Sequence, residues 1–166
     1  MAVRIVVLAD THIPDFAKAL PAAVIPALRR ADLILHAGDV NRAWVLQELA
    51  DFAPVRAVAG NNDHADVTAW GAPEELTTVL GGVTLAMVHD SGSREGRERR
   101  LRARFPAARL IVFGHSHIPL SYADGGVRFV NPGSATWKRR QSFATYGRIT
   151  VSDGRVRRAE IVSIEP

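Results

Sequence analysis

The 166-residue chain contains no cysteine. This absence excludes a disulfide framework, a thiolate nucleophile, and any zinc or iron–sulfur site held by cysteine. A metal ion bound by this protein must therefore take oxygen and nitrogen ligands, for which the sequence offers six histidines and 17 acidic residues.

Long apolar runs are also missing. The first run, residues 3–9, contains Arg4 and is too short for a secretion signal or for the roughly 20 residues of a membrane span. The 47% hydrophobic and 23% charged residues are typical of a folded globular chain, and Pro and Gly are scattered without a linker or repeat. We expect one cytoplasmic domain, residues 1–166, with no membrane partner.

The net charge of +4 is modest, but 19 of the 21 basic residues are arginine and seven of them lie between Arg94 and Arg109. Leu101 and Phe105 within this run are spaced as apolar partners on one side of an amphipathic helix. A solvated helix face is the favoured interpretation, and a surface for an anionic partner such as nucleic acid is the alternative.

The first third of the chain alternates apolar runs with helical stretches. The predicted strands are residues 3–9, 33–37 and 55–59, and the predicted helices are 22–30 and 42–52, with Pro26 expected to kink the first. This β-α-β-α-β order implies parallel strands that end at one edge of a sheet.

The second half predicts antiparallel pairing. Gly81-Gly82 separates two apolar runs as in a hairpin, and Asp153-Gly154 marks a second turn. The predicted strands are residues 76–80, 83–88, 110–113, 127–130, 143–151 and 156–164.

Polar residues stand directly after five of the predicted strands. They are Asp10 and His12, then Asp39, then the run Asn61, Asn62 and Asp63, then His89, and finally His115 and His117. In open α/β sheets, ligands bind outside the carboxyl ends of the strands, so these clusters should meet at one site. Gly38, Gly60 and Gly114 directly precede three of these clusters, and glycine suits a sharp turn of the chain at the end of a strand.

This mixture of carboxylate, amide and imidazole groups suits manganese, iron or zinc. Two carboxylates, Asp10 and Asp39, at ~4 Å would repel by ~4 kcal/mol at an effective dielectric of 20 unless a cation lay between them. Seven ligands drawn from these nine residues would exceed the four that one tetrahedral ion uses, which favours two metal ions that share a carboxylate. Taken alone, each cluster also has an ordinary explanation as a turn or cap.

In this order, the clusters resemble the calcineurin-like metallophosphoesterase superfamily, whose pattern is D-x-H, G-D, G-N-x-D, H and G-H-x-H. The form of residues 36–39 and the segment 131–134 look like the compact YfcE-type phosphodiesterase branch. The resemblance implies an α/β fold, a two-sheet αββα sandwich with a β-α-β-α-β N-terminal half and a hairpin-rich C-terminal half.

The resemblance also implies the ligands of two divalent ions, most simply Mn²⁺, with Ni²⁺, Fe²⁺ or Zn²⁺ as alternatives. One ion would be held by Asp10, His12, Asp39 and His117, and the other by Asp39, Asn61, His89 and His115, so that Asp39 bridges them. The implied reaction is hydrolysis of a small phosphodiester by in-line attack of a metal-bridging hydroxide.

Three residues after the third strand are candidate catalytic residues. Many family members have a histidine where this chain has Asn62, which cannot act as a general acid but could donate a hydrogen bond to phosphate. Protonation of the leaving group would then fall to water or His64, and Asp63 would orient a ligand histidine or fix the loop. We therefore expect diesters with good leaving groups to be hydrolysed faster than alkyl monoesters.

Other segments are expected near the site. The resemblance places the segment 131–134 at its rim, and Lys138, Arg139 and Arg140 could bind phosphate or form a solvated loop. Loops 13–20 and 90–96 are expected over the crevice, and His36 is expected to form hydrogen bonds rather than bind metal.

Two other functions are compatible with the sequence. A retromer subunit shares the fold of this superfamily and acts chiefly as an interaction scaffold, and a nuclease or nucleic-acid binder could use the arginine run.

Overall fold

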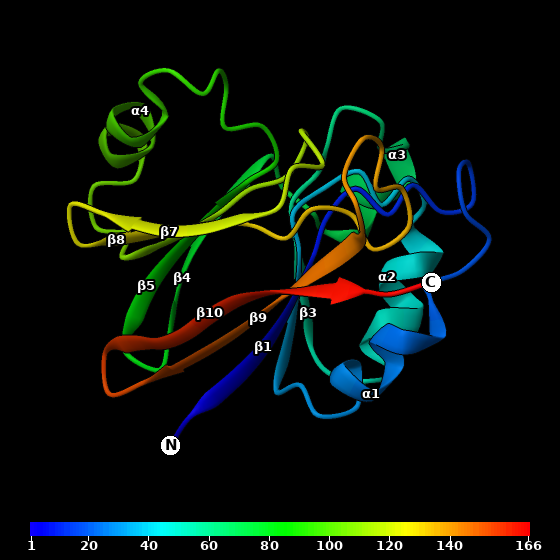
Figure 1. The fold of residues 1–166 in the computed structure, drawn as a ribbon, viewed down its shortest axis with the longest axis horizontal. Helices are drawn as coiled ribbons and strands as arrows, with labels where there is room; N and C mark the ends of the chain where they lie inside the picture. The colour runs from blue at the N-terminus through cyan, green and yellow to red at the C-terminus, as the bar shows by residue number, and fades with distance from the viewer.

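The computed structural model describes residues 1–166 as two five-stranded sheets packed face to face, with helices on both outer faces (Figure 1). This is the predicted αββα sandwich. The first sheet has the order β10-β9-β1-β2-β3 and the second has the order β4-β5-β6-β8-β7. No helix is long and apolar enough to cross a membrane.

The first sheet contains the predicted parallel strands β1 (Val3–Leu8), β2 (Leu33–His36) and β3 (Val55–Ala57). Their carboxyl ends lie at the same edge, as expected. Two C-terminal strands, β9 (Ala144–Ser152) and β10 (Arg155–Ile164), complete the sheet, and β9 pairs antiparallel with β1.

The second sheet is only partly the antiparallel structure that the sequence predicts. β4 (Glu75–Leu80) and β5 (Val83–Val88) form the expected hairpin, with positive φ at both Gly81 and Gly82 as a type I′ turn requires. However, β5, β6 (Leu110–Val112) and β8 (Val127–Asn131) are parallel to one another. The prediction failed there because two crossovers, through α4 (Arg97–Arg104) and through β7 (Leu120–Asp124), return the chain to the same end of the sheet.

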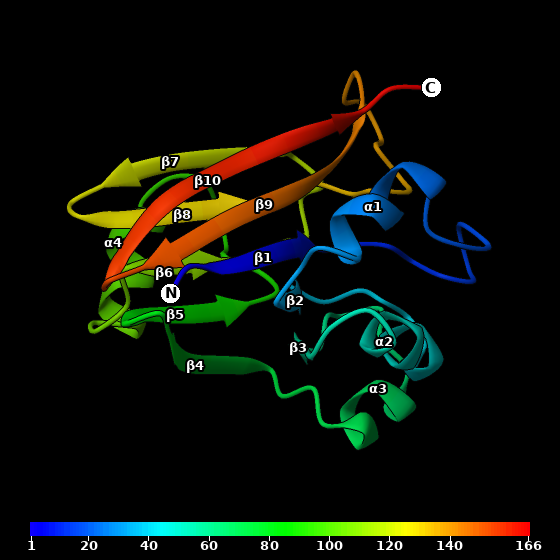
Figure 2. The same ribbon diagram turned by 90° about the horizontal axis from the view of Figure 1, so that it is seen from below.

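The helices are shorter than predicted. The stretch 22–30 forms a 3₁₀ turn, Ala22–Val24, followed by α1 (Ile25–Leu28), and Pro26 lies in the first turn of α1 rather than in a helix interior. The other helices are α2 (Ala43–Ala50), α3 (Ala65–Trp70) and α4. Neither α3 nor β7 was predicted. Figure 2 shows α1, α2 and α3 on one side of the molecule and α4 on the other.

Alternation along the strands divides the core into layers. Ile5 and Val7 of β1 face the second sheet, whereas Val6 and Leu8 face α1 and α2. Each such buried side chain contributes about 1.5–3 kcal/mol of transfer free energy, so both faces of β1 are anchored. The predicted apolar pair, Leu101 of α4 and Phe105 directly after it, is buried on the outer face of the second sheet.

Candidate metal centre

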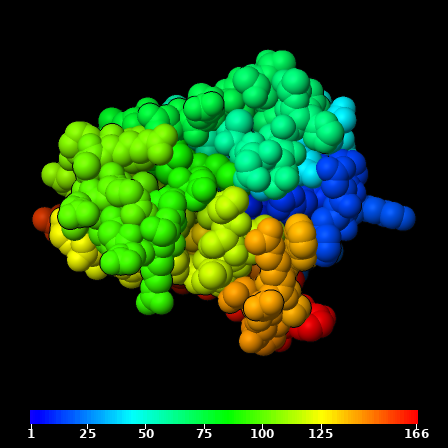
Figure 3. All heavy atoms as spheres, turned by 90° about the horizontal axis from the view of Figure 1, so that it is seen from above, coloured from blue at the N-terminus to red at the C-terminus, as the bar shows by residue number.

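Loops that follow five strands meet at one edge of the sandwich, viewed in Figure 3. The structure brings all seven predicted ligands to this edge: Asp10 and His12 follow β1, Asp39 follows β2, Asn61 follows β3, His89 follows β5, and His115 and His117 follow β6. Because β1, β2 and β3 are parallel, as are β5 and β6, these side chains leave the two sheets at the same end.

Asp10, His12 and His117 form a buried group. The Nε2 atoms of the two imidazoles are 3.3 Å apart, and Asp10 Oδ1 lies 3.6 Å from His117 Nε2 and 4.0 Å from His12 Nε2. These three ligand atoms converge on a space of the size that one metal ion occupies.

Asp39, His89 and His115 form a second group, which includes Asn61. Asn61 Oδ1 lies 3.1 Å from His89 Nε2 and 3.1 Å from His115 Nδ1. Asp39 Oδ2 lies 3.4 Å from His89 Nε2. Asn61 and His115 are exposed, so this group opens to solvent.

Asp39 connects the two groups. Its Oδ2 atom is 3.4 Å from His89 in one group and 3.7 Å from His12 in the other. Asn62 holds this carboxylate with its backbone N–H to Oδ1 and its side-chain Nδ2 to Oδ2, both at 2.8 Å. This is the position that a bridging carboxylate requires.

Hydrogen bonds on the far side of three imidazoles fix their orientation. His89 Nδ1 donates to the carbonyl of Ala37 at 2.7 Å, and His117 Nδ1 donates to the carbonyl of Trp137 at 2.7 Å. His12 Nδ1 faces Asn41 Oδ1 at 3.2 Å. A carbonyl oxygen can only accept, so each Nδ1 bears the proton and each Nε2 is directed at the ligand groups.

The backbone at the site is unusual. Only eight non-glycine residues have positive φ, and five of them are predicted ligands: Asp10, His12, Asp39, His115 and His117, with φ between 47° and 69°. Non-glycine residues adopt this region at a cost of roughly 1–3 kcal/mol each, and such residues cluster at functional sites. The fold therefore holds these side chains in place at the expense of stability.

The motif glycines allow close approach between loops. A Cβ atom on Gly38 would lie 2.5 Å from His89 Nδ1, and one on Gly114 would lie 2.9 Å from Asp10 Oδ2. A Cβ atom on Gly60 would overlap the carboxylate of Asp39. Among these three, only Gly38 has a positive φ, so the expected sharp exit from the strand explains Gly38 and close packing explains the other two.

The charged groups of the site favour the binding of a cation. Asp10 Oδ1 is buried without a hydrogen-bond partner, and burial raises the pKa of this carboxyl to about 7. Burial also opposes ionisation of Asp39 and His89, but their mutual interaction outweighs it, lowering the pKa of Asp39 and raising that of His89 to about 9. An unpartnered buried carboxylate oxygen facing imidazole nitrogens matches the oxygen and nitrogen donors of a divalent metal site.

The predicted catalytic residues lie in different environments. Asn62 is exposed and donates a hydrogen bond to Asp39. His64 is also exposed, and its Nε2 lies 3.8 Å from Asp15 Oδ2. Asp63 accepts backbone N–H bonds from Gly60 at 2.7 Å, Asn41 at 2.7 Å and Asp39 at 3.0 Å. The structure therefore gives Asp63 the loop-fixing role and shows no bond from it to a histidine.

The segment 131–134 lies beneath the site rather than at its rim. Asn131 Nδ2 donates to the carbonyl of Gly114 at 3.0 Å, and Ser134 Oγ donates to the carbonyl of Asp10 at 2.7 Å. Both side chains are buried. Both side chains therefore brace loops that carry predicted ligands. The contact of Ser134 with Asp10 joins residues more than 120 positions apart, and local sequence patterns did not reveal it.

His36 and Thr11 form another buried support. His36 Nε2 donates to Thr11 Oγ1 at 2.9 Å, while its Nδ1 accepts the backbone N–H of Gly38 at 3.3 Å. Burial lowers the pKa of His36 to about 3, so the imidazole is neutral. This confirms the expectation that His36 forms hydrogen bonds, and it links the loops that carry Asp10 and Asp39.

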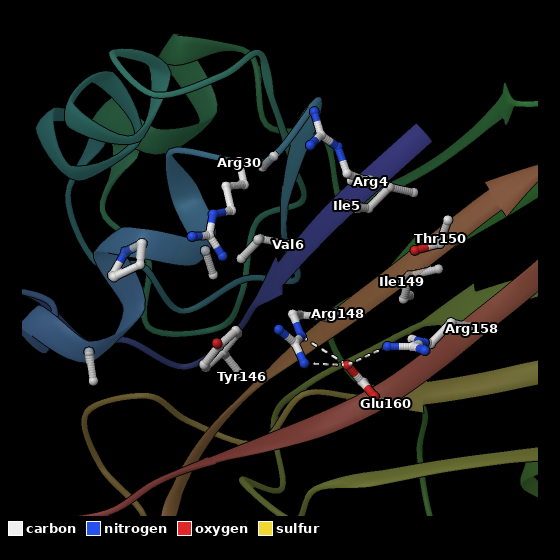
Figure 4. Close-up of a pocket in the computed structure, with 14 residues that line it drawn as sticks. Arg4, Ile5, Val6, Arg30, Tyr146, Arg148, Ile149, Thr150, Arg158 and Glu160 are labelled. Carbon is white, nitrogen blue, oxygen red and sulfur yellow. Dashed lines mark hydrogen bonds and ion pairs between the residues drawn. The ribbon is translucent and has the colours of Figure 1, made fainter. Parts of the chain in front are cut away.

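Two cavities flank the centre. One, of about 600 Å³, is lined by His12 and Asn62, and the other, of about 730 Å³, is lined by Asn61, His89 and His115. A separate cavity on the outer face of the first sheet is lined by Tyr146, Arg148 and other residues, none of which is a predicted ligand (Figure 4).

The comparisons with known proteins agree with this geometry. Residues 3–154 match the calcineurin-like phosphoesterase superfamily domain. A probable metallophosphoesterase of Methanothermobacter thermautotrophicus is 35% identical over 136 residues, which cover 80% of this chain and 77% of that protein.

Solved structures share the fold over almost the whole chain. A Thermotoga maritima protein is 29% identical with a TM-score of 0.76, covering 98% of this chain and 99% of that one. Vacuolar Protein Sorting 29 from Cryptosporidium parvum is 20% identical with a TM-score of 0.80, at 98% and 99% coverage, and shows likeness of fold alone. From the family match, the curated relative and the two ligand groups, we conclude that this chain belongs to the calcineurin-like phosphoesterase superfamily.

Proposed function

We propose that the protein is a phosphodiesterase that depends on two divalent metal ions. The observation that carries the proposal is the position of Asp39, whose Oδ2 lies within 3.7 Å of an imidazole nitrogen in each ligand group. Asp10, His12 and His117 would hold one ion, and Asn61, His89 and His115 the other, with Asp39 bound to both. Mn²⁺ is the ion we propose first, because manganese accepts mixed oxygen and imidazole ligands.

When bound, two such ions clamp phosphate oxygens and activate water for in-line attack on phosphorus. The chain itself supplies orientation. Asn62 keeps the shared carboxylate in place through two hydrogen bonds, and its exposed amide is available to a phosphate oxygen. Because ions provide the positive charge, the site needs no arginine among its ligands.

We expect the protein to hydrolyse diesters with good leaving groups faster than alkyl monoesters. Asn62 cannot donate a proton, so the alkoxide of an alkyl monoester would depart without help from this position. His64 lines the same cavity as His12 and Asn62, and we propose it as the side chain that could protonate a leaving group.

The arginine run is used mainly within the fold. Arg102 pairs with Asp124, Arg104 pairs with Glu75, and Arg97 lies 5.1 Å from the centroid of the Phe113 ring. Arg100 donates to backbone carbonyls of the loop before α4. These contacts favour a structural role for the run over a surface for nucleic acid.

An interaction scaffold is the second candidate, because the fold is so similar to Vacuolar Protein Sorting 29. The ligand set supports the enzyme, since all seven positions carry side chains able to bind metal. A scaffold would not need the buried, unpartnered oxygen of Asp10 or the left-handed backbone at five ligands.

The test is to strip the protein of metal and restore Mn²⁺, Ni²⁺, Zn²⁺ or Mg²⁺ singly while following hydrolysis of bis(p-nitrophenyl) phosphate. We expect at least Mn²⁺ to restore turnover, and we expect an Asp39→Ala variant to remain inactive with every ion. If no ion raises turnover above that of the variant, the enzyme proposal fails and the scaffold proposal is favoured.

A further inference from the structure

The cavity of about 600 Å³ beside His12 has an aromatic wall. Phe16 and Trp137 stack with ring centroids 4.5 Å apart and an interplanar angle of 12°. Trp137 also meets His12 and His117 edge to face, at 5.3 Å and 5.2 Å. The wall therefore begins at the first ligand group and extends away from it.

The wall is fixed to the metal centre by hydrogen bonds. The backbone N–H of Phe16 donates to the carbonyl of His12 at 2.7 Å. The backbone N–H of Trp137 donates to Ser134 Oγ at 2.8 Å, and its carbonyl accepts His117 Nδ1. Figure 3 shows the blue segment that contains Phe16 near the orange segment that contains Trp137. Both rings are thus positioned before any substrate arrives.

Phe16 lines this cavity and is 51% exposed. Its packing on Trp137 leaves a large part of the ring open to a ligand. The guanidinium of Arg139 lies 4.8 Å from the centroid of the Trp137 ring and adds positive charge to the same cavity. The wall therefore combines a planar apolar surface with a cation.

The cavity on the other side of the centre has a different chemistry. It is lined by Glu74, Asp90 and Arg104, among others, and by no aromatic residue other than the two predicted ligand histidines. An aromatic substituent therefore has a stacking partner on the His12 side and none on the His115 side.

Building on the proposed function, we propose that the substrate carries a planar aromatic group, a nucleobase or a simple aryl ring, which stacks on Phe16 while its phosphate lies at the metal centre. A stacked aromatic pair gains more binding energy than the burial of its surface area alone provides. A saturated ring of the same size does not gain this additional energy. The preference of the site should therefore follow planarity rather than hydrophobicity.

The test compares benzylphosphonate with cyclohexylmethylphosphonate by calorimetric titration into the manganese-loaded protein. The two probes have the same charged group and carbon count, and the saturated ring is the more hydrophobic. We expect benzylphosphonate to bind about fivefold more tightly, the ratio that one aromatic pair supplies. A Phe16→Leu variant should lose this preference, and a Phe143→Leu variant, altered at an exposed phenylalanine that lines another cavity, should keep it.

Equal binding of the two phosphonates, or a preference unchanged by Phe16→Leu, would overturn the inference. Titration with inorganic phosphate separates this failure from failure of the proposed function. If the manganese-loaded protein binds phosphate but shows no preference for the aromatic phosphonate, the stacking inference alone fails. If it does not bind phosphate, both proposals fail. Thymidine 5′-monophosphate identifies the source of the aromatic group, because tighter binding than benzylphosphonate indicates a nucleobase and weaker binding indicates a simple aryl ring.

Discussion

Replacement of Asp63 by Asn tests how the loops that carry the shared carboxylate are held. The Asp63 carboxylate accepts three backbone N–H bonds, two at Oδ2 from Gly60 and Asp39 and one at Oδ1 from Asn41. An amide retains one acceptor oxygen and directs an NH₂ group at a backbone donor. At least one charge-assisted bond is lost, worth about 1.5–3 kcal/mol.

The net loss in the free energy of unfolding should be at the lower end of that range. Burial raises the pKa of Asp63, so removal of its charge also removes an unfavourable desolvation. We expect Asp63→Asn to lower the free energy of unfolding of metal-free protein by about 1–2 kcal/mol. Because Asp39 is held by the same bonds, Mn²⁺ affinity should fall about 10–100-fold.

The assays are urea denaturation with a chelator present and calorimetric titration with Mn²⁺. Asp51→Asn is the matched control, since Asp51 is exposed at the end of α2, and it should change stability by less than about 0.5 kcal/mol. If Asp63→Asn matched this control in both assays, the carboxylate would not be what positions the loops.

Three further predictions concern neighbouring residues. Gly60→Ala should weaken Mn²⁺ binding at least about tenfold in a titration, since its Cβ would displace Asp39, and unchanged affinity would contradict the close packing. Burial lowers the pKa of His36 from 6.5 to about 3, so the stability that its neutral form provides is complete above pH 6.5 and declines toward pH 3. His36→Gln should therefore flatten the decline measured by denaturation, by about 2 kcal/mol at pH 5. Asn62→His should raise the turnover of alkyl monoesters relative to diesters by about tenfold or more in paired assays, and an unchanged ratio would show that this position does not limit leaving-group departure.

Much of the first sheet could be predicted from the sequence because its strands are short, apolar and separated by helical stretches. The runs at β1 and β2 have both faces largely buried, which produces nearly continuous hydrophobic sequence, whereas β3 carries the exposed Arg56. β7 was missed because it is an edge strand with no fully buried residue. The parallel order of β5, β6 and β8 was missed because strand direction there is set by crossovers and not by local pattern.

The metal-ligand candidates could be located in the sequence because each follows a strand and the ordered spacing is specific. The residues that support them could not. Ser134 and Thr136 bond to the carbonyls of Asp10 and Thr11, more than 120 residues earlier in the chain. The stacking of Phe16 on Trp137 likewise joins two distant loops, and no periodicity marks either aromatic residue as part of the site.

The number of metal ions bound per chain tests most directly whether Asp39 joins the two ligand groups. We would measure it by elemental analysis of Mn²⁺-equilibrated, desalted protein and by anomalous diffraction from crystals, for the natural chain and for Asp39→Ala. We expect two ions in contact with Asp39 in the natural chain and no tightly bound ion at either site in the variant. A single ion, or two ions retained by the variant, would show that Asp39 does not join the two ligand groups into one binuclear centre.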